Sequence, residues 1–130
     1  MTSAIEQRIV TFLLKHIEGI KLIYLFGSHS KGTANNNSDI DIAIMSLQPL
    51  DNVLRFNIAQ QLAIELDSDI DLVDLNSAST VLQMQVISTG KKLFGESVFD
   101  ITYAAQIYSM YGRLQEDRQE IINDFKNEYN

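Results

Sequence analysis

The sequence predicts an α+β fold: a small mixed β-sheet with helices packed on it and a long C-terminal helix. Two hydrophobic patterns alternate along the 130 residues, namely apolar residues at helical spacing and short continuous apolar runs of strand length. Glycine and polar residues separate these segments. We find no internal repeat, low-complexity segment or linker, so residues 1–130 are expected to form a single minimal domain.

The first half of the chain predicts a helix followed by two strands. Apolar residues recur at helical spacing over Ile5–Ile17, and Gly19 stands where a helix end would be capped. The continuous apolar run Leu22–Phe26 is typical of a central strand that is covered on both faces. A polar turn is expected at residues 34–38, and a second strand at Asp39–Met45.

The second half of the chain predicts a helix, a third strand and further helices. Pro49 is expected to open a helix whose apolar stripe continues to Leu66. A polar turn at residues 67–69 precedes a third strand at Ile70–Leu75. The remaining segments are predicted as a helix at 79–88, a short edge strand at 92–94 and a long amphipathic helix at 99–125.

Charge and composition limit the classes of partner. There are 17 acidic and 10 basic residues, a net charge of −7, and no cluster of lysine and arginine, so direct binding of nucleic acid through its phosphates is disfavoured. A nucleoside triphosphate neutralised by Mg²⁺ stays compatible with this charge. The chain has no cysteine, which excludes thiolate chemistry and favours a cytoplasmic protein. No membrane association is expected, because no run approaches the roughly 18 apolar residues of a membrane span.

An anion-binding turn is predicted where the first strand ends, at Gly27 and Ser28. Glycine allows the backbone to approach a ligand closely, and a serine hydroxyl beside the free N–H groups of a helix start suits a phosphate. A Gly-Ser pair after a strand is, by itself, most often a plain turn. Lys31 either contributes a point charge to a bound triphosphate or is an ordinary surface lysine.

A pair of carboxylates follows at Asp39 and Asp41. Residues two apart on a strand point to the same face, with Cα atoms about 6.5 Å apart, while the isoleucines that alternate with them point into the core. Two carboxylates held in this way can share two Mg²⁺ ions. An isolated Asp-x-Asp is more often a solvated edge or a calcium-type loop. In combination with the Gly-Ser turn, it favours a site for a metal-bound triphosphate.

These residues resemble a known signature. Gly27-Ser28, ten intervening residues and Asp39-Ile40-Asp41 resemble the motif of the DNA polymerase β nucleotidyltransferase superfamily. The short chain resembles its minimal nucleotidyltransferases in particular, well over residues 1–75 and only loosely at the C-terminal end. The resemblance implies that glycine and serine hold the triphosphate of the donor, that the two aspartates bind Mg²⁺, and that a third carboxylate on a neighbouring strand completes the site. Many relatives have arginine where this chain has Lys31.

Three residues are candidates for the third carboxylate. Asp71 is flanked by Ile70 and Leu72, where burying a carboxylate is costly unless a cation or a donor meets it. Asp69 shares the face of Asp71 but belongs to a polar turn, and Asp74 alternates onto the opposite face. We expect Asp71 to bind metal together with Asp39 and Asp41 and to help activate the acceptor; Asp69 and Asp74 remain alternatives.

The acceptor is expected to be a separate protein, because the chain is too short to include the extra domain with which larger members of the superfamily bind theirs. The resemblance to minimal nucleotidyltransferases implies an antitoxin that transfers AMP from ATP to a tyrosine of a HEPN-domain ribonuclease toxin. A small-molecule, antibiotic-type nucleotidyltransferase is one alternative, and a non-catalytic antitoxin acting by stoichiometric binding is another. Tyr108, Met110 and Tyr111 of the long helix fit a protein interface, although such residues more commonly pack on their own sheet.

Overall fold

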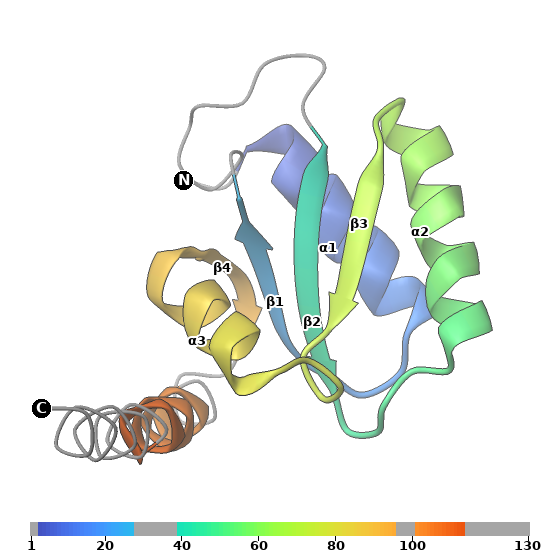
Figure 1. Ribbon diagram of the computed structural model, residues 1–130. Helices are drawn as coiled ribbons and strands as arrows, with labels where there is room; N and C mark the ends of the chain where they lie inside the picture. The colour runs from blue at the N-terminus through green and yellow to red at the C-terminus, as the bar shows by residue number, and fades with distance from the viewer. Residues whose placement is uncertain (1–2, 28–38, 96–100, 114–130) are drawn as a thin grey trace, which may run out of the picture.

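The computed structural model describes residues 3–27, 39–95 and 101–113. Its strands form a four-stranded mixed sheet of order β3-β2-β1-β4 (Figure 1), in which β1 is antiparallel to β2 and β4 while β2 is parallel to β3. The mixed sheet with packed helices confirms the predicted fold class. In chain order the elements are α1 (Ala4–His16), β1 (Ile20–Phe26), β2 (Ile40–Ser46), α2 (Asn52–Leu66), β3 (Ile70–Asp74), α3 (Thr80–Thr89) and β4 (Lys91–Gly95), followed by helical residues 101–113.

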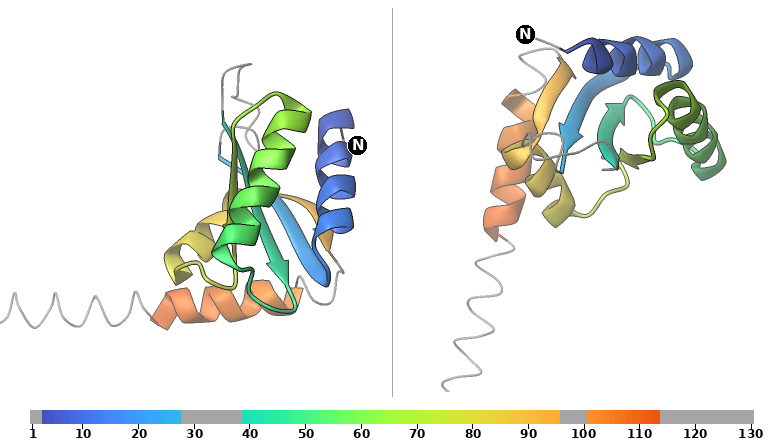
Figure 2. Two further views of the ribbon diagram at one scale, coloured as in Figure 1. Left: turned by 90° about the vertical axis from the view of Figure 1, so that its right-hand side faces the viewer. Right: turned by 90° about the horizontal axis from the view of Figure 1, so that it is seen from above.

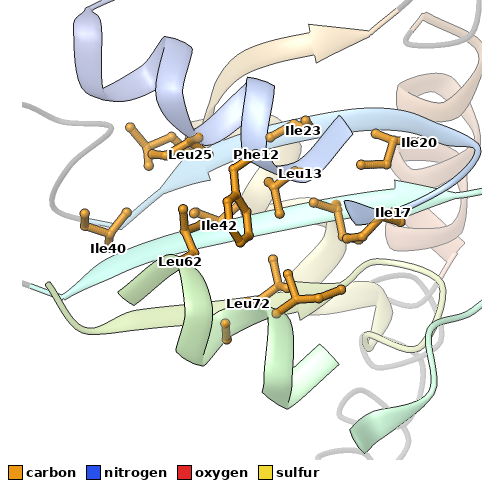
Figure 3. Packing of buried hydrophobic residues seen from close by; sticks show 14 residues of the cluster. Phe12, Leu13, Ile17, Ile20, Ile23, Leu25, Ile40, Ile42, Leu62 and Leu72 are labelled. Carbon is orange, nitrogen blue, oxygen red and sulfur yellow. The ribbon is translucent and has the colours of Figure 1, made fainter. Parts of the chain in front are cut away.

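Helices pack on both faces of the sheet (Figure 2). On one face, α1 and α2 cover a first core, and Figure 3 shows its side chains gathered between these helices and the strands. On the other face, α3 and residues 101–113 cover a second core. Alternate residues of β1 enter the two cores, as Ile23 and Leu25 do on one side and Leu22 and Tyr24 on the other. The prediction of a central strand covered on both faces is therefore confirmed.

The start of α1 is fastened to the edge strand β4. Ser3 and Glu6 form a capping box, in which each side chain accepts a hydrogen bond from the backbone N–H of the other residue. The Glu6 carboxylate also accepts two hydrogen bonds from the Lys91 ammonium, at 2.9 and 3.0 Å, although Glu6 is only 8% exposed. Because a buried carboxylate is costly without partners, this ion pair holds the helix start and the strand together.

The predicted start of α2 is wrong. The helix begins at Asn52 rather than at Pro49, because the side chain of Asp51 accepts a hydrogen bond from the backbone N–H of Leu54 and so caps the first turn. The predicted apolar stripe is also interrupted at this end. Val53 is 65% exposed, and the stripe packs on the sheet only from the second turn onwards.

The C-terminal helix is confirmed for residues 101–113, and the rest of the predicted segment lies outside the described residues. Tyr103 and Ile107 are buried in the second core. The Tyr103 hydroxyl donates to the Gln83 side chain of α3, and burial raises the pKa of the phenol above its usual range. Tyr108 is 47% exposed, so it does not complete the packing on the sheet. Among the residues described, no helix combines the length and the apolar character that crossing a membrane requires.

Candidate active site

The candidate site lies at the end of the sheet where β1 finishes and where β2 and β3 begin (Figure 1). In the parallel pairing of β2 with β3, Asp41 is the partner of Asp71. The backbone N–H of Ile40 donates to the carbonyl of Asp69 at 2.9 Å, which sets this alignment at the first residue of β2. Paired residues on neighbouring strands, about 4.8 Å apart, point to the same face. Asp41 and Asp71 therefore project side by side, and alternation places Asp39 on the same face.

This is the face that α3 and residues 101–113 cover further along the strands. Ala43 and Val73, two residues beyond Asp41 and Asp71, pack in the second core. Ile40 and the other isoleucines of β2 instead enter the first core, as the sequence predicted. In both β2 and β3, the carboxylates at the strand start point to one face of the sheet, and the apolar residues that alternate with them are packed in the first core on the other face. A site at this end of the sheet is formed by β1 and β2, the two most buried strands, together with the outermost strand β3.

The expected burial of Asp71 is wrong. Asp71 and Asp39 are exposed, and Asp41 is half-buried. The reason is that the second core covers this face of the sheet only further along the strands, from Ala43 and Val73 onwards, and leaves the start of β3 open. The register with Asp41, rather than a cost of burial, is what favours Asp71 as the third carboxylate.

Gly27 stands directly against one of the carboxylates. Its φ of +71° lies in the left-handed region, and a Cβ built on this residue would collide with the Oδ2 atom of Asp41. The close approach expected at the Gly-Ser turn therefore exists, although the group that it brings close is a carboxylate of the chain itself. Ser28 and Lys31, and the turn predicted at residues 34–38, lie outside the described residues.

Sequence reasoning missed Phe26, the last residue of β1. It is paired with Asp41 across the β1–β2 ladder, and so lies on the same face beside the carboxylates. Within an unbroken apolar run, nothing distinguished this half-buried side chain from the core residues before it. Only the register of the two strands reveals its position.

The carboxylates suit a hard cation by the type of their ligand atoms. Asp39, Asp41 and Asp71 offer only oxygen ligands, which Mg²⁺ prefers, and Asp41 and Asp71 lie in register at one end of the sheet. Within residues 3–27, 39–95 and 101–113, no group of three His, Cys, Asp or Glu side chains is arranged to hold a metal ion. Rotation of exposed carboxylates about their side-chain torsions is the movement that would bring them together.

The two alternatives for the third carboxylate have different surroundings. Asp69 is exposed and immediately precedes β3 on the side of Asp71. Asp74 lies in register with Ile44 of the first core and is only 4% exposed. Its two carboxylate oxygens accept hydrogen bonds from the backbone N–H groups of Leu50 at 2.8 Å and Asn76 at 3.0 Å. These bonds hold the connection between β2 and α2 against the end of β3, far from the other carboxylates.

Asp74→Ala is therefore expected to reduce the stability of the fold, whereas Asp71→Ala is expected to abolish nucleotide transfer. Asp74→Ala leaves two backbone donors without their acceptor, which should lower the free energy of unfolding by about 3 kcal/mol. Asp71→Ala removes an exposed side chain and should change it by less than about 0.5 kcal/mol, while nucleotide transfer is lost. Urea denaturation and a transfer assay on both variants measure this contrast. Equal stability of the two variants would contradict the structural role of Asp74.

Comparisons with known proteins agree with this geometry. Residues 7–98 match the protein family described as "Polymerase beta, Nucleotidyltransferase". The chain is 52% identical over 119 residues to the protein adenylyltransferase MntA of Shewanella oneidensis, covering 92% of this chain and 86% of that protein. A crystal structure of a toxin–antitoxin with AMP-PNP superposes with a TM-score of 0.86 at 52% identity, covering 92% of this chain and 96% of that one.

A second solved structure extends the likeness. It contains the tri-AMPylated HEPN toxin of Shewanella oneidensis in complex with its MNT antitoxin, and it matches with a TM-score of 0.81 at 48% identity over 95% of this chain and 98% of that one. The resemblance predicted from the Gly-Ser and Asp-x-Asp motifs is confirmed by both the sequence and the structural comparisons. The chain belongs to the polymerase β nucleotidyltransferase family and is a homologue of a protein adenylyltransferase.

Proposed function

We propose that this chain is an antitoxin that uses Mg²⁺ to transfer AMP from ATP to a tyrosine of a HEPN-domain toxin and thereby inactivates it. The observation that carries the proposal is the register of Asp41 with Asp71 on one face of the sheet, beside the close approach of Gly27. The relative that is a protein adenylyltransferase supports the reaction. The complexes with AMP-PNP and with a tri-AMPylated toxin support the donor and the acceptor.

Each candidate residue has a role in this reaction. Asp39, Asp41 and Asp71 would bind Mg²⁺, which when bound neutralises the phosphates and polarises the reacting phosphoryl group. Gly27 and Ser28 would hold the triphosphate, with Lys31 adding a positive charge. The attacking hydroxyl gives its proton to a base at Asp71 while its oxygen bonds to the α-phosphorus, and the bond from that phosphorus to pyrophosphate breaks.

The charge of the chain supports a protein acceptor. With a net charge of −7, the surface repels a nucleic-acid backbone, whereas a partner protein can bring complementary charge. The absence of cysteine supports action in the cytoplasm.

Intact-mass measurement tests the proposal. The chain is incubated with Mg²⁺, ATP and the protein encoded by the neighbouring gene, and both proteins are then weighed. We expect the partner to gain the mass of one or more AMP units, on tyrosine by peptide mapping, and to gain none when EDTA replaces Mg²⁺. If the partner is neutralised without any gain in mass, the chain acts by stoichiometric binding and the proposal is wrong.

A further inference from the structure

Asp41 has different surroundings from the other two candidate metal ligands. Its side chain is half-buried, whereas those of Asp39 and Asp71 are exposed. On one side of Asp41 lies its register partner Asp71, which is itself polar and exposed. On the other side lies the end of β1, where Phe26 is its partner in the antiparallel ladder and Gly27 follows. The apolar neighbour of Asp41 in the paired strands therefore comes from β1.

Gly27 determines the direction in which the Asp41 side chain extends. A Cβ built on Gly27 would collide with Oδ2 of Asp41 and would lie 3.4 Å from its Cγ. The carboxylate therefore occupies the space that a side chain of residue 27 would take. It extends towards the end of β1, away from the second core, and lies directly against the backbone of the turn that is proposed to hold the triphosphate.

Phe26 borders the same carboxylate and is itself fixed by packing. Its side chain is half-buried against the second core, which also contains Tyr24 on the same face of β1. The Cβ atoms of residues paired across antiparallel strands lie about 5 Å apart, a distance that an aromatic ring can span. Packing on the core restricts the side-chain torsions of the ring. Phe26 thus places a rigid apolar group beside Asp41.

The other two carboxylates have no such neighbour in the strand pairing that the structure describes. Asp71 is paired with Asp41 alone, on the outermost strand of the sheet, and Asp39 precedes the first residue of β2. Their exposed side chains must rotate to reach a shared cation. Asp41 is the one carboxylate of the three whose rotation the strand beside it restricts.

We propose that Phe26 is a positioning residue for metal binding: its ring and the backbone of Gly27 confine the Asp41 carboxylate and direct it to the place where Mg²⁺ binds. Asp41 is then the fixed ligand, and Asp39 and Asp71 turn towards the metal. Groups that orient a metal ligand without touching the metal contribute about ten- to a hundredfold to affinity or activity. The inference rests on the metal site of the proposed function and not on the identity of the acceptor.

Direct contact between the Phe26 ring and the nucleoside of the donor is the competing role, because aromatic rings stack on other aromatic groups. The two roles differ in their dependence on metal. A residue that acts through Asp41 strengthens nucleotide binding only when Mg²⁺ is present. A ring that touches the nucleoside strengthens binding equally with and without Mg²⁺.

Phe26→Ala and the matched control Phe94→Ala separate a role in metal binding from a role in folding. Phe94 is also a half-buried phenylalanine on a strand, but it packs on the first core, on the opposite face of the sheet. Both variants should melt about 5–10 °C below the wild type. Phe26→Leu keeps most of the apolar volume and provides a second variant that is expected to fold. Calorimetric titration with AMP-PNP, in Mg²⁺ and in EDTA, gives the Kd values.

We expect Mg²⁺ to strengthen the binding of AMP-PNP to the wild type, because metal and nucleotide bind to one site and each raises the affinity for the other. Phe26→Ala should reduce this strengthening about tenfold or more and leave the Kd in EDTA within about twofold of the wild type. Phe26→Leu should reduce it in the same direction by a smaller factor. Phe94→Ala should retain it fully, although the control is destabilised to a similar degree.

Three results would overturn the role of Phe26: full strengthening by Mg²⁺ in its variants, an equal loss in Phe94→Ala, or a Kd raised equally in Mg²⁺ and in EDTA. If the alanine variant does not fold, the leucine variant decides by the same criteria. A wild type whose binding of AMP-PNP does not respond to Mg²⁺ contradicts the metal site and the role of Phe26 together. A wild type that responds to Mg²⁺ but transfers no AMP to the partner contradicts the proposed function alone.

Discussion

Asp39→Ala/Asp41→Ala is expected to lower the rate of AMP transfer by about a thousandfold or more, which corresponds to about 4 kcal/mol of transition-state stabilisation. The reason is that the pair supplies two of the three oxygen ligands proposed for Mg²⁺ on this face. The rate is measured as AMP incorporated into the partner at saturating ATP and Mg²⁺. Glu18→Ala is the matched control, because it removes an exposed carboxylate from the opposite end of the sheet and should leave the rate unchanged.

The same variant also separates metal binding from folding. Without Mg²⁺, its melting temperature should lie within about 3 °C of the wild type, since the carboxylates are exposed or half-buried at a strand start. Millimolar Mg²⁺ should raise the melting temperature of the wild type, because a ligand that binds only the folded state stabilises it, and should not raise that of the variant. Transfer at the wild-type rate by a correctly folded variant would refute the assignment of these aspartates.

Gly27→Ala is expected to reduce both stability and transfer. At a φ of +71°, a Cβ costs about 1–2 kcal/mol in backbone strain. The new methyl group would also collide with the Oδ2 atom of Asp41 and displace that carboxylate. A displacement of about 1 Å at a reacting group can lower a rate about a hundredfold, so we expect a loss of that size in kcat. Urea denaturation and the transfer assay measure the two effects.

Gly19→Ala is a close control for this substitution. Gly19 has the same φ of +71°, but its Cβ would meet the flexible side chain of Leu47 at 3.1 Å, at the opposite end of the sheet. It should therefore lose stability to a similar degree and keep its rate of transfer. If both variants lost activity equally, the effect would come from general destabilisation, and the contact between Gly27 and Asp41 would have no special importance for the reaction.

Local patterns were enough to predict the order and type of the described elements. The unbroken run of β1 indicated a strand buried on both faces, and the alternation at the start of β2 indicated carboxylates on one face with isoleucines on the other. The start of α2 was misplaced because a proline is compatible with a helix start, whereas the hydrogen bond of Asp51 decides where the first turn forms.

The relations between strands were beyond the reach of these patterns. The pairing of Asp41 with Asp71 is a register between segments 30 positions apart, and the edge position of β3 is a property of the whole sheet. The extent of the second core along the strands is also a tertiary property, so the exposure of Asp71 was predicted wrongly, even though its face was assigned correctly. Asp74 likewise shows its two backbone partners only once the β2–α2 connection is folded against the strand.

The ion pair between Glu6 and Lys91 joins residues that are 85 positions apart, and it forms where β4 closes the free side of β1. Such distant pairings raise the contact order of the fold, because a long loop must be closed before they form, and folding slows accordingly. The second core likewise cannot form completely until Val86 and Tyr103 have been synthesised. During synthesis on the ribosome, the chain therefore has all of its candidate carboxylates by residue 71 but can lock their sheet only after residue 95 has emerged.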